Sequence, residues 1–332
     1  MNKKTVFYFF TALVVLIFKP DLSYSTPTIF KYNVDECLDF WTPEKIKKAK
    51  PLKPRNIAKP LKTRNSRFRK RSGGITIRNT TDSSKYTKSM PPSERKYDII
   101  NNTISVADVD QIRNFPMGIL FISHNGDLFS CSASVINTNI GNIGLTAAHC
   151  LYDPESQAIF NNIMFSPGFD HGQLGPLNLI PVAQAVVTDQ FRAHNDDEFD
   201  WGMMRFAFNL NGYPLEYYTG SLGWIFNVGG NVRTVICGYP DGGNLPNCPN
   251  NGVTLCTWEG APNLAEDYYA IPDLELGNGA SGAPFIMNYD PNTNLGWLYS
   301  NYANFDGIED EAVGPIYDPI EFQALLGLLG GL

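Results

Sequence analysis

The feature that most constrains the fold is a series of short apolar segments separated by clusters of Gly, Pro, Asn and Asp. The segments cover residues 117–122, 132–136, 144–148, 182–187, 202–206, 232–238 and 253–258. They have the length of strands, and many short strands with frequent turns predict an all-β sandwich or barrel. With 332 residues, 43% of them hydrophobic, the chain can form about two domains with a sizeable core.

The end of the chain has the one clear helical signature. Asp318 suits an N-terminal cap, Pro319 suits the first helical position, and Glu321 completes a capping box. Two glycines follow the segment and are typical of a helix end. We therefore predict a C-terminal α-helix over residues 318–329.

Residues 1–25 have the pattern of a secretory signal peptide. Lys3 and Lys4 precede an apolar run over 6–18, and small residues come before a cut that we expect ahead of Thr26. A membrane anchor is the alternative, but about 20 residues are needed to cross the ~30 Å hydrocarbon layer. No later segment is long and apolar enough. We therefore expect a secreted, extracellular protein with no membrane association after signal cleavage.

Residues 45–71 are strongly basic, since 13 of these 27 residues are Lys or Arg. Such a segment buries too little apolar surface to offset the entropy of ordering. Basic pairs in exposed loops are where secretory processing proteases cut. We predict a basic, flexible propeptide over 26–71 that is removed after Arg71. A solvated basic tail is one alternative, and a nuclear-import or nucleic-acid patch is another that the signal peptide disfavours.

A linker is predicted after the basic segment. Residues 72–96 are rich in Ser, Thr, Lys and Pro. Asn79 and Asn101 each begin an Asn-x-Thr sequence, which is an acceptor for N-glycosylation in a secreted protein. We therefore expect a glycoprotein whose folded part begins near residue 97.

The net charge of −7 averages two very different parts of the chain. Residues 26–71 contain 14 basic and 4 acidic residues, for a charge of +10. Residues 72–332 contain 9 basic and 28 acidic residues, for a charge of −19. This acidity argues against nucleic acid as a partner. Instead, the propeptide and the folded part are expected to attract each other, and salt should weaken that attraction.

Three short pieces of the chain carry residues suited to acid–base and nucleophilic chemistry. His149, one of only four histidines, follows small residues at a strand end. Cys131 lies 19 residues upstream of Cys150, and a disulfide between the two would pin the turn that carries His149. Asp200 directly precedes an apolar run and can reach a histidine. Ser281 is surrounded by glycines, whose torsional freedom lets successive N–H groups point towards an anion.

These pieces resemble the motifs of the chymotrypsin-like (trypsin-fold) serine peptidases. The matching sequences are Thr-Ala-Ala-His-Cys at 146–150, Asp-Trp-Gly-Met-Met at 200–204 and Gly-Ala-Ser-Gly-Ala-Pro at 279–284. The order His, Asp, Ser is that of this family and differs from subtilisins and α/β-hydrolases. The resemblance covers about residues 98–328. Cys-Gly-Tyr-Pro at 237–240 makes it closest to the V8-like, glutamyl-endopeptidase-like branch.

The resemblance implies a fold. It predicts an all-β peptidase domain over 97–332, built from two antiparallel six-stranded β-barrels with a C-terminal α-helix. The first barrel is expected over about 97–208 and the second over about 209–317. The active-site cleft is expected to lie between the two barrels.

The resemblance also implies a role for each residue. Ser281 is the expected nucleophile, His149 the general base, and Asp200 the group that orients the imidazole. The N–H groups of Gly279 and Ser281 are expected to hold the oxyanion. This chemistry hydrolyses peptide bonds of proteins or peptides through an acyl-enzyme, with no cofactor and no metal. The alternatives are an inactive homologue that binds partners and an esterase with the same triad.

The specificity pocket is less well determined by the sequence. Glu275 lies six residues before Ser281, at the position of the pocket base in trypsin-like enzymes, and Ser300 and Tyr302 match the other wall. A carboxylate at the base favours Arg or Lys before the cut. The alternative is a surface Glu in a shifted loop. V8-type enzymes have a His where this chain has Tyr299, which argues against Glu specificity.

Ala280 departs from the trypsin pattern, which has Asp directly before the serine. No carboxylate is present there to pair with a new N-terminal amine after activation. Removal of the basic propeptide is therefore expected to act by unblocking the cleft.

Four cysteines remain after Cys131 and Cys150 are paired. Cys37, Cys237, Cys248 and Cys256 allow three pairings, and the sequence does not select one. Cys37 lies in the predicted propeptide, so a bond from it to the peptidase domain would tether the cut propeptide.

Overall fold

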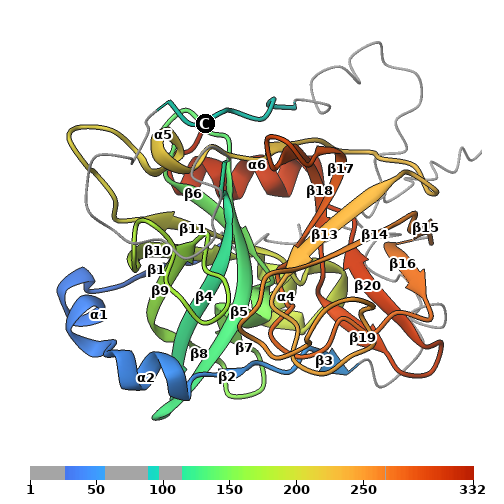
Figure 1. Cartoon of the computed structure of the whole chain (residues 1–332), viewed down its shortest axis with the longest axis horizontal. Coiled ribbons are helices and arrows are strands. Elements are labelled where there is room, and N and C mark those ends of the chain that lie inside the picture. Colours follow the sequence, from blue (N-terminus) through green and yellow to red (C-terminus); the bar gives the residue numbers. More distant parts are fainter. Residues whose placement is uncertain (1–26, 57–88, 97–113, 266) are drawn as a thin grey trace, which may run out of the picture.

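The computed structural model contains two β-rich units, drawn in green and in orange to red in Figure 1. It describes residues 27–56, 89–96, 114–265 and 267–332. Four predicted features lie outside these residues: the signal peptide 1–25, the cut after Arg71, and the acceptor residues Asn79 and Asn101. Among the described residues, no helix has the length and apolar character needed to cross a bilayer.

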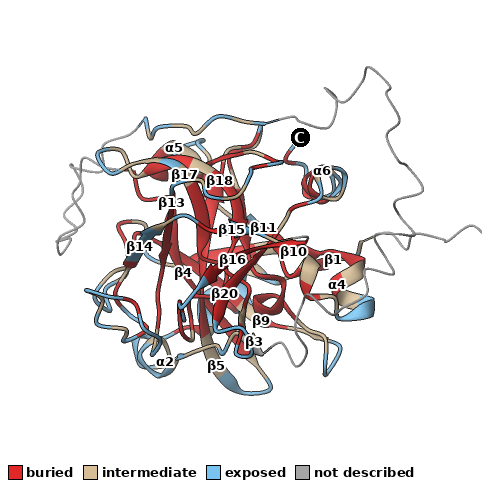
Figure 2. Ribbon diagram, turned by 90° about the vertical axis from the view of Figure 1, so that its right-hand side faces the viewer, coloured by how far each residue is buried: buried red, intermediate tan, exposed pale blue. Residues whose placement is uncertain are grey.

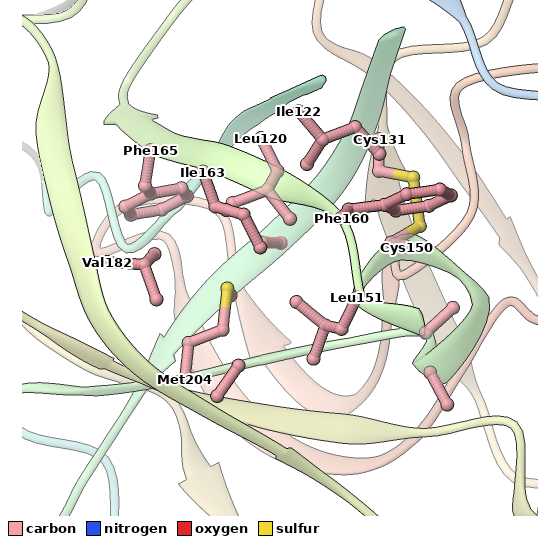
Figure 3. Packing of buried hydrophobic residues seen from close by; sticks show 14 of the residues in the cluster. Leu120, Ile122, Cys131, Cys150, Leu151, Phe160, Ile163, Phe165, Val182 and Met204 are labelled. Atoms are coloured by element: carbon pink, nitrogen blue, oxygen red, sulfur yellow. A yellow bond between two sulfur atoms is a disulfide. The ribbon is translucent and has the colours of Figure 1, made fainter. Parts of the chain in front are cut away.

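Six strands close the first unit into a barrel. In order around the ring they are β4 (Met117–His124), β5 (Asp127–Ile136), β6 (Ile143–Thr146), β11 (Gly202–Phe206), β10 (Ile180–Val187) and β9 (Asn161–Pro167). The ring closes because β9 pairs antiparallel with both β4 and β10. Leu120, Phe165 and Met204 fill the interior, as Figure 3 shows. This is the first of the two barrels that the sequence predicts.

The strands of the second unit are divided between two five-stranded sheets. One contains β12 (Gly223–Trp224), β18 (Leu295–Asn301), β17 (Pro284–Asp290), β13 (Thr234–Gly238) and β14 (Cys256–Gly260). The other contains β15 (Asn263–Leu264), β16 (Tyr268–Pro272), β20 (Glu311–Pro315), β19 (Asn304–Asp306) and β3 (Arg55–Asn56). The edge-on rings of Tyr269 and Tyr299, one from each sheet, help to join them. Hydrogen bonding therefore does not run around a single closed ring here.

The C-terminal helix α6 (Pro319–Leu328) packs on both units. The Asp318 side chain accepts hydrogen bonds from two N–H groups of the first turn, as its capping role predicts. Phe322 contacts Trp201 from the first unit and Trp224 from the second. Figure 2 shows how fully the strands around this helix are buried. Two shorter helices, α4 (Asp189–His194) and α5 (Leu215–Thr219), are not predicted because they are too short to show a helical period.

The prediction of a flexible segment over 26–71 is wrong for residues 27–56. These residues form β1 (Ile29–Lys31), α1 (Val34–Phe40), α2 (Pro43–Lys48), β2 (Lys50–Pro51) and β3. β1 pairs antiparallel with β10, so the segment extends the sheet of the first barrel. Figure 1 shows α1 and α2, in blue, at the outer side of this barrel.

Apolar side chains that precede the lysine run explain this order. Cys37 and Trp41 are buried with Phe121 of β4 in one cluster on the outside of the barrel. The indole Nε1 of Trp41 also donates a hydrogen bond to the carbonyl of Asn162 at 2.5 Å. The strongly basic composition begins at Lys45, whereas the apolar residues that anchor the segment lie immediately upstream.

The last residues of the predicted linker also contact the folded part. Met90 forms an antiparallel bridge with Trp224, and Ser93 forms one with Ser221. Residues 89–96 therefore lie along the second unit.

Two disulfides are present among the described residues. One joins Cys131 and Cys150, at one end of the cluster in Figure 3. The other joins Cys248 and Cys256. Cys37 and Cys237 remain buried thiols, which belong to different hydrophobic clusters. In this structure the N-terminal segment is therefore attached to the barrel by packing and hydrogen bonds and not through Cys37.

Candidate active site

Strand pairing brings His149 and Asp200 together. His149 lies in a short 3-10 turn that follows β6, and Asp200 lies directly before β11. β6 and β11 are antiparallel neighbours, and Gly202 is opposite Thr146. The end of one strand therefore meets the start of the other, which places the two side chains side by side although they are 51 positions apart in the sequence.

Two hydrogen bonds join this histidine to this aspartate. The Asp200 carboxylate accepts from the backbone N–H of His149 at 2.9 Å, and its other oxygen lies 2.7 Å from Nδ1. Asp200 is fully buried and His149 is 4% exposed. Since a carboxylate only accepts, the proton of the neutral ring lies on Nδ1 and Nε2 is free to accept a proton. The Asn301 side chain also donates to the Asp200 carbonyl at 3.3 Å.

The loop before β17 carries Ser281 against the first barrel. Gly279 and Gly282 have φ angles of +76° and +86°, which favour glycine. A Cβ on Gly282 would lie 2.2 Å from both the Ser132 carbonyl and the Thr146 hydroxyl. The N–H of Ser132 donates to the carbonyl of Ser281 at 2.8 Å. Close packing of the two units thus requires glycine here and sets the position of the serine.

The hydrogen bond from Ser281 to His149 that would complete a triad is not formed in this structure. Ser281 Oγ and His149 Nε2 are both buried, and neither has a hydrogen-bond partner among the described residues. The two residues still share one site, because Cys150 Sγ lies 3.8 Å from the Ser281 carbonyl. Catalytic hydrogen bonds are often long before substrate binds. Within the described residues, no three His, Cys, Asp or Glu side chains are grouped to hold a metal ion.

The structure brings two of the three predicted pocket residues near each other. The Tyr302 hydroxyl is buried and has no hydrogen-bond partner in the described part of the chain, and burial, followed by the Glu275 carboxylate, raises the pKa of this tyrosine. Glu275 itself is exposed. Ser300 is buried and its hydroxyl donates to the Pro315 carbonyl at 2.7 Å, so this hydroxyl is already bonded within the fold. Tyr299 is bonded to Thr234 at 2.6 Å, and burial raises its pKa to about 12.

Sequence reasoning missed several groups that shape the site. Ser132 Oγ donates to the Gly279 carbonyl at 2.9 Å and accepts from the N–H of Tyr239 at 3.1 Å. Nothing in the sequence around Ser132 distinguishes it from other strand serines. The N–H of Gly279 donates to the carbonyl of Leu52 at 2.8 Å, and Leu52 belongs to the N-terminal segment. The composition of that segment did not predict such a contact.

Comparison with known proteins finds similarity in solved structures alone. No protein-family model matches the chain, and no curated protein sequence matches it. The thermostable serine protease AL20 from an extremophilic microorganism has a TM-score of 0.56 and 20% identity, covering 66% of this chain and 99% of that one. Protease Anisep from Arthrobacter nicotinovorans has a TM-score of 0.55 and 21% identity, covering 66% and 96%.

A Glu endopeptidase, solved in complex with MPD, is also similar, with a TM-score of 0.50 and 14% identity over 69% of this chain and 96% of that one. At these identities the likeness shows the fold. The chain thus has the chymotrypsin-like, trypsin-type fold, as its motifs indicate, and its structural neighbours are serine proteases.

Proposed function

We propose that this protein is a secreted serine endopeptidase. The observation that carries the proposal is the buried His149–Asp200 pair beside Ser281, on a fold whose structural neighbours are serine proteases. A buried carboxylate against a histidine favours proton transfer to the outer ring nitrogen.

The proposed reaction begins at Ser281. Its hydroxyl attacks the carbonyl carbon of the peptide bond while His149 Nε2 takes the proton, and Asp200 stabilises the imidazolium that forms. The C–N bond breaks as His149 returns the proton to the leaving amine. Water then attacks the acyl-enzyme, again with His149 as base, and releases the acid and free Ser281.

Backbone donors are proposed to stabilise the oxyanion. The N–H groups of Gly279 and Ser281 would converge on it, and the positive φ of Gly279 is a backbone conformation that glycine adopts readily. Loss of one such donor costs on the order of 10²–10³ in rate.

We propose a preference for Arg or Lys before the cut. The Glu275 carboxylate acts on the buried Tyr302 hydroxyl, which puts a negative charge beside the proposed pocket. The charge of −19 on residues 72–332 also disfavours acidic substrates.

Serine-directed labelling tests the proposal. A fluorophosphonate probe should modify the secreted protein after its N-terminal segment is removed, and Ser281→Ala should abolish the label. Absence of label in the wild-type protein would identify an inactive homologue. If ester substrates were cleaved and peptides of matched sequence were not, the protein would be an esterase.

A further inference from the structure

Residues 50–56, called here the strap, cross from the first barrel to the second unit. β2, at the start of the strap, pairs in parallel with β5, where Lys50 is opposite Phe129. β3, at its end, pairs in parallel with β19, where Arg55 is opposite Asn304. Figure 1 shows β2 and β3 along the lower side of the molecule, spanning from β5 to β19.

Leu52, in the middle of the strap, is bonded to both units. Its N–H donates to the Ser130 carbonyl of β5 at 2.9 Å. Its carbonyl accepts from the N–H of Gly279 at 2.8 Å. Gly279 N–H is the donor proposed to hold the oxyanion, so the strap places a peptide carbonyl where a substrate carbonyl would have to bind.

Pro51 occupies a cradle made by two glycines. A Cβ on Gly279 would lie 2.9 Å from Pro51 Cβ, and a Cβ on Gly252 would lie 2.5 Å from Pro51 Cγ. Both glycines have positive φ, +76° and +73° respectively. Any side chain at either position would collide with the proline ring. The strap is therefore in close contact with the loop that carries the proposed nucleophile.

The reactive atoms are buried together with this strap in place. Ser281 is fully buried, and its Oγ has no hydrogen-bond partner among the described residues, like His149 Nε2. Burying polar atoms unpaired costs free energy that water or a substrate would otherwise offset. A nucleophile withheld from solvent in this way is what a closed cleft produces.

The upstream end of the strap is held independently of its downstream end. Residues 29–49 form a clamp through β1, which pairs with β10, and through the buried Trp41. A cut after Arg71 leaves the clamp and the strap joined to each other. At short linker lengths, a tethered segment has an effective concentration in the millimolar range. The clamp therefore keeps the strap close to Gly279 after that cut.

We propose that the strap is an inhibitor built into the chain, in which the Leu52 carbonyl competes with the substrate carbonyl for the N–H of Gly279. The inhibition itself rests on the proposed function. The hydrogen bond between the Leu52 carbonyl and the Gly279 N–H does not depend on that function. The occupant is a segment of this same chain, held by backbone hydrogen bonds and by the fit of Pro51. The clamp keeps it there after the downstream cut.

Three full-length proteins test the inference. Leu52→Pro removes the N–H that donates to Ser130 and should release the strap. Lys53→Ala is the matched control, because Lys53 is the exposed neighbour. The rate of fluorophosphonate labelling should rise at least tenfold in Leu52→Pro and stay at the wild-type value in Lys53→Ala. A single cooperative unfolding transition in each variant verifies that it is folded.

Hydrogen exchange gives a readout that does not depend on catalysis. The amide of Gly279 should exchange slowly in the wild type and in Lys53→Ala, and at least tenfold faster in Leu52→Pro. If the wild type were labelled as fast as Leu52→Pro, and if the Gly279 amide exchanged at the same rate in both proteins, the inference would be overturned. The proposed function would remain intact. Absence of label in every form, with faster Gly279 exchange in Leu52→Pro, would support the strap and overturn the proposed function. Should Leu52→Pro fail to fold, Pro51→Gly replaces it with the same criteria.

Discussion

Asp200 fixes the position and the tautomer of His149. It accepts two hydrogen bonds from His149, one from the backbone and one from Nδ1, so it fixes both the position of the turn and the tautomer of the ring. An amide in its place would offer a donor towards Nδ1 and favour the opposite tautomer, with the proton on Nε2. Histidine in that tautomer could not accept the proton of Ser281.

Asp200→Asn should therefore lower kcat by about 10⁴-fold while KM changes little. The measurement is steady-state hydrolysis of a peptide substrate by the processed protein. Asp127→Asn, an exposed residue at the start of β5, is the control and should leave kcat unchanged. A loss of less than tenfold in Asp200→Asn would exclude the proposed role of this carboxylate.

Glu275→Gln tests the origin of specificity. If the carboxylate pairs with basic substrates, the ratio of kcat/KM for Arg over Gln before the cut should fall by about 10- to 100-fold, since a charge-assisted contact contributes about 1.5–3 kcal/mol. A panel of peptides that differ in that single residue measures it. Preference of the wild type for Glu over Arg would contradict the proposed pocket.

At the scale of one element, α6 shows how local and tertiary effects divide. The cap and the proline of the first turn are local, and they set where the helix begins. Packing of Phe322 against Trp201 and Trp224 is tertiary, and it holds the helix against both units. Burial, with Asp318 and Asp189 nearby, raises the pKa of Glu321 to about 7.

Glu321→Gln should stabilise the protein at pH 8 and have little effect at pH 4. The folded-state pKa of Glu321 lies above its usual 4.5, so this carboxyl is protonated longer in the folded state. Its contribution to stability is therefore lost as pH rises from about 4.5 through about 7. The gain at pH 8 is at most about 3 kcal/mol, and less because the carboxyl is partly exposed. Denaturant unfolding at both pH values measures it, and an equal effect at both would contradict the assignment.

At the scale of the whole molecule, charge is segregated along the chain. A segment of charge +10 precedes a part of charge −19. Apolar anchoring adds a contribution that charge alone would not supply, because Trp41 is buried against the first barrel. Electrostatic attraction weakens with salt, whereas burial of apolar surface does not.

After a cut following Arg71, the two pieces should remain associated and separate more readily at high salt. We expect the dissociation constant to rise at least tenfold between 0.05 M and 0.5 M NaCl, because screening shortens the reach of the charges. Analytical ultracentrifugation of the cut protein measures it. Trp41→Ala should weaken association at both salt concentrations by a similar factor. Salt-independent association would show that charge contributes nothing.

Motif spacing anticipated much of this molecule. The strands over 117–122, 132–136 and 202–206 are present as β4, β5 and β11, because short apolar runs between turn residues are a local property. Short strands such as β19 were not anticipated, since pairing with β20 and β3 makes them strands. The N-terminal segment was predicted to be flexible because lysines dominate its composition. A few buried apolar residues nevertheless hold it against the first barrel.

The sequence by itself determined the order of the reactive residues, the fold class and the start of the last helix, because each depends on short motifs. Only the tertiary structure decided that residues 27–56 are ordered and that the Leu52 carbonyl meets the N–H of Gly279. These two groups are separated by more than 200 residues, and no local pattern marks a backbone carbonyl as a partner. Contacts of that kind form only when both units and the N-terminal segment are packed together.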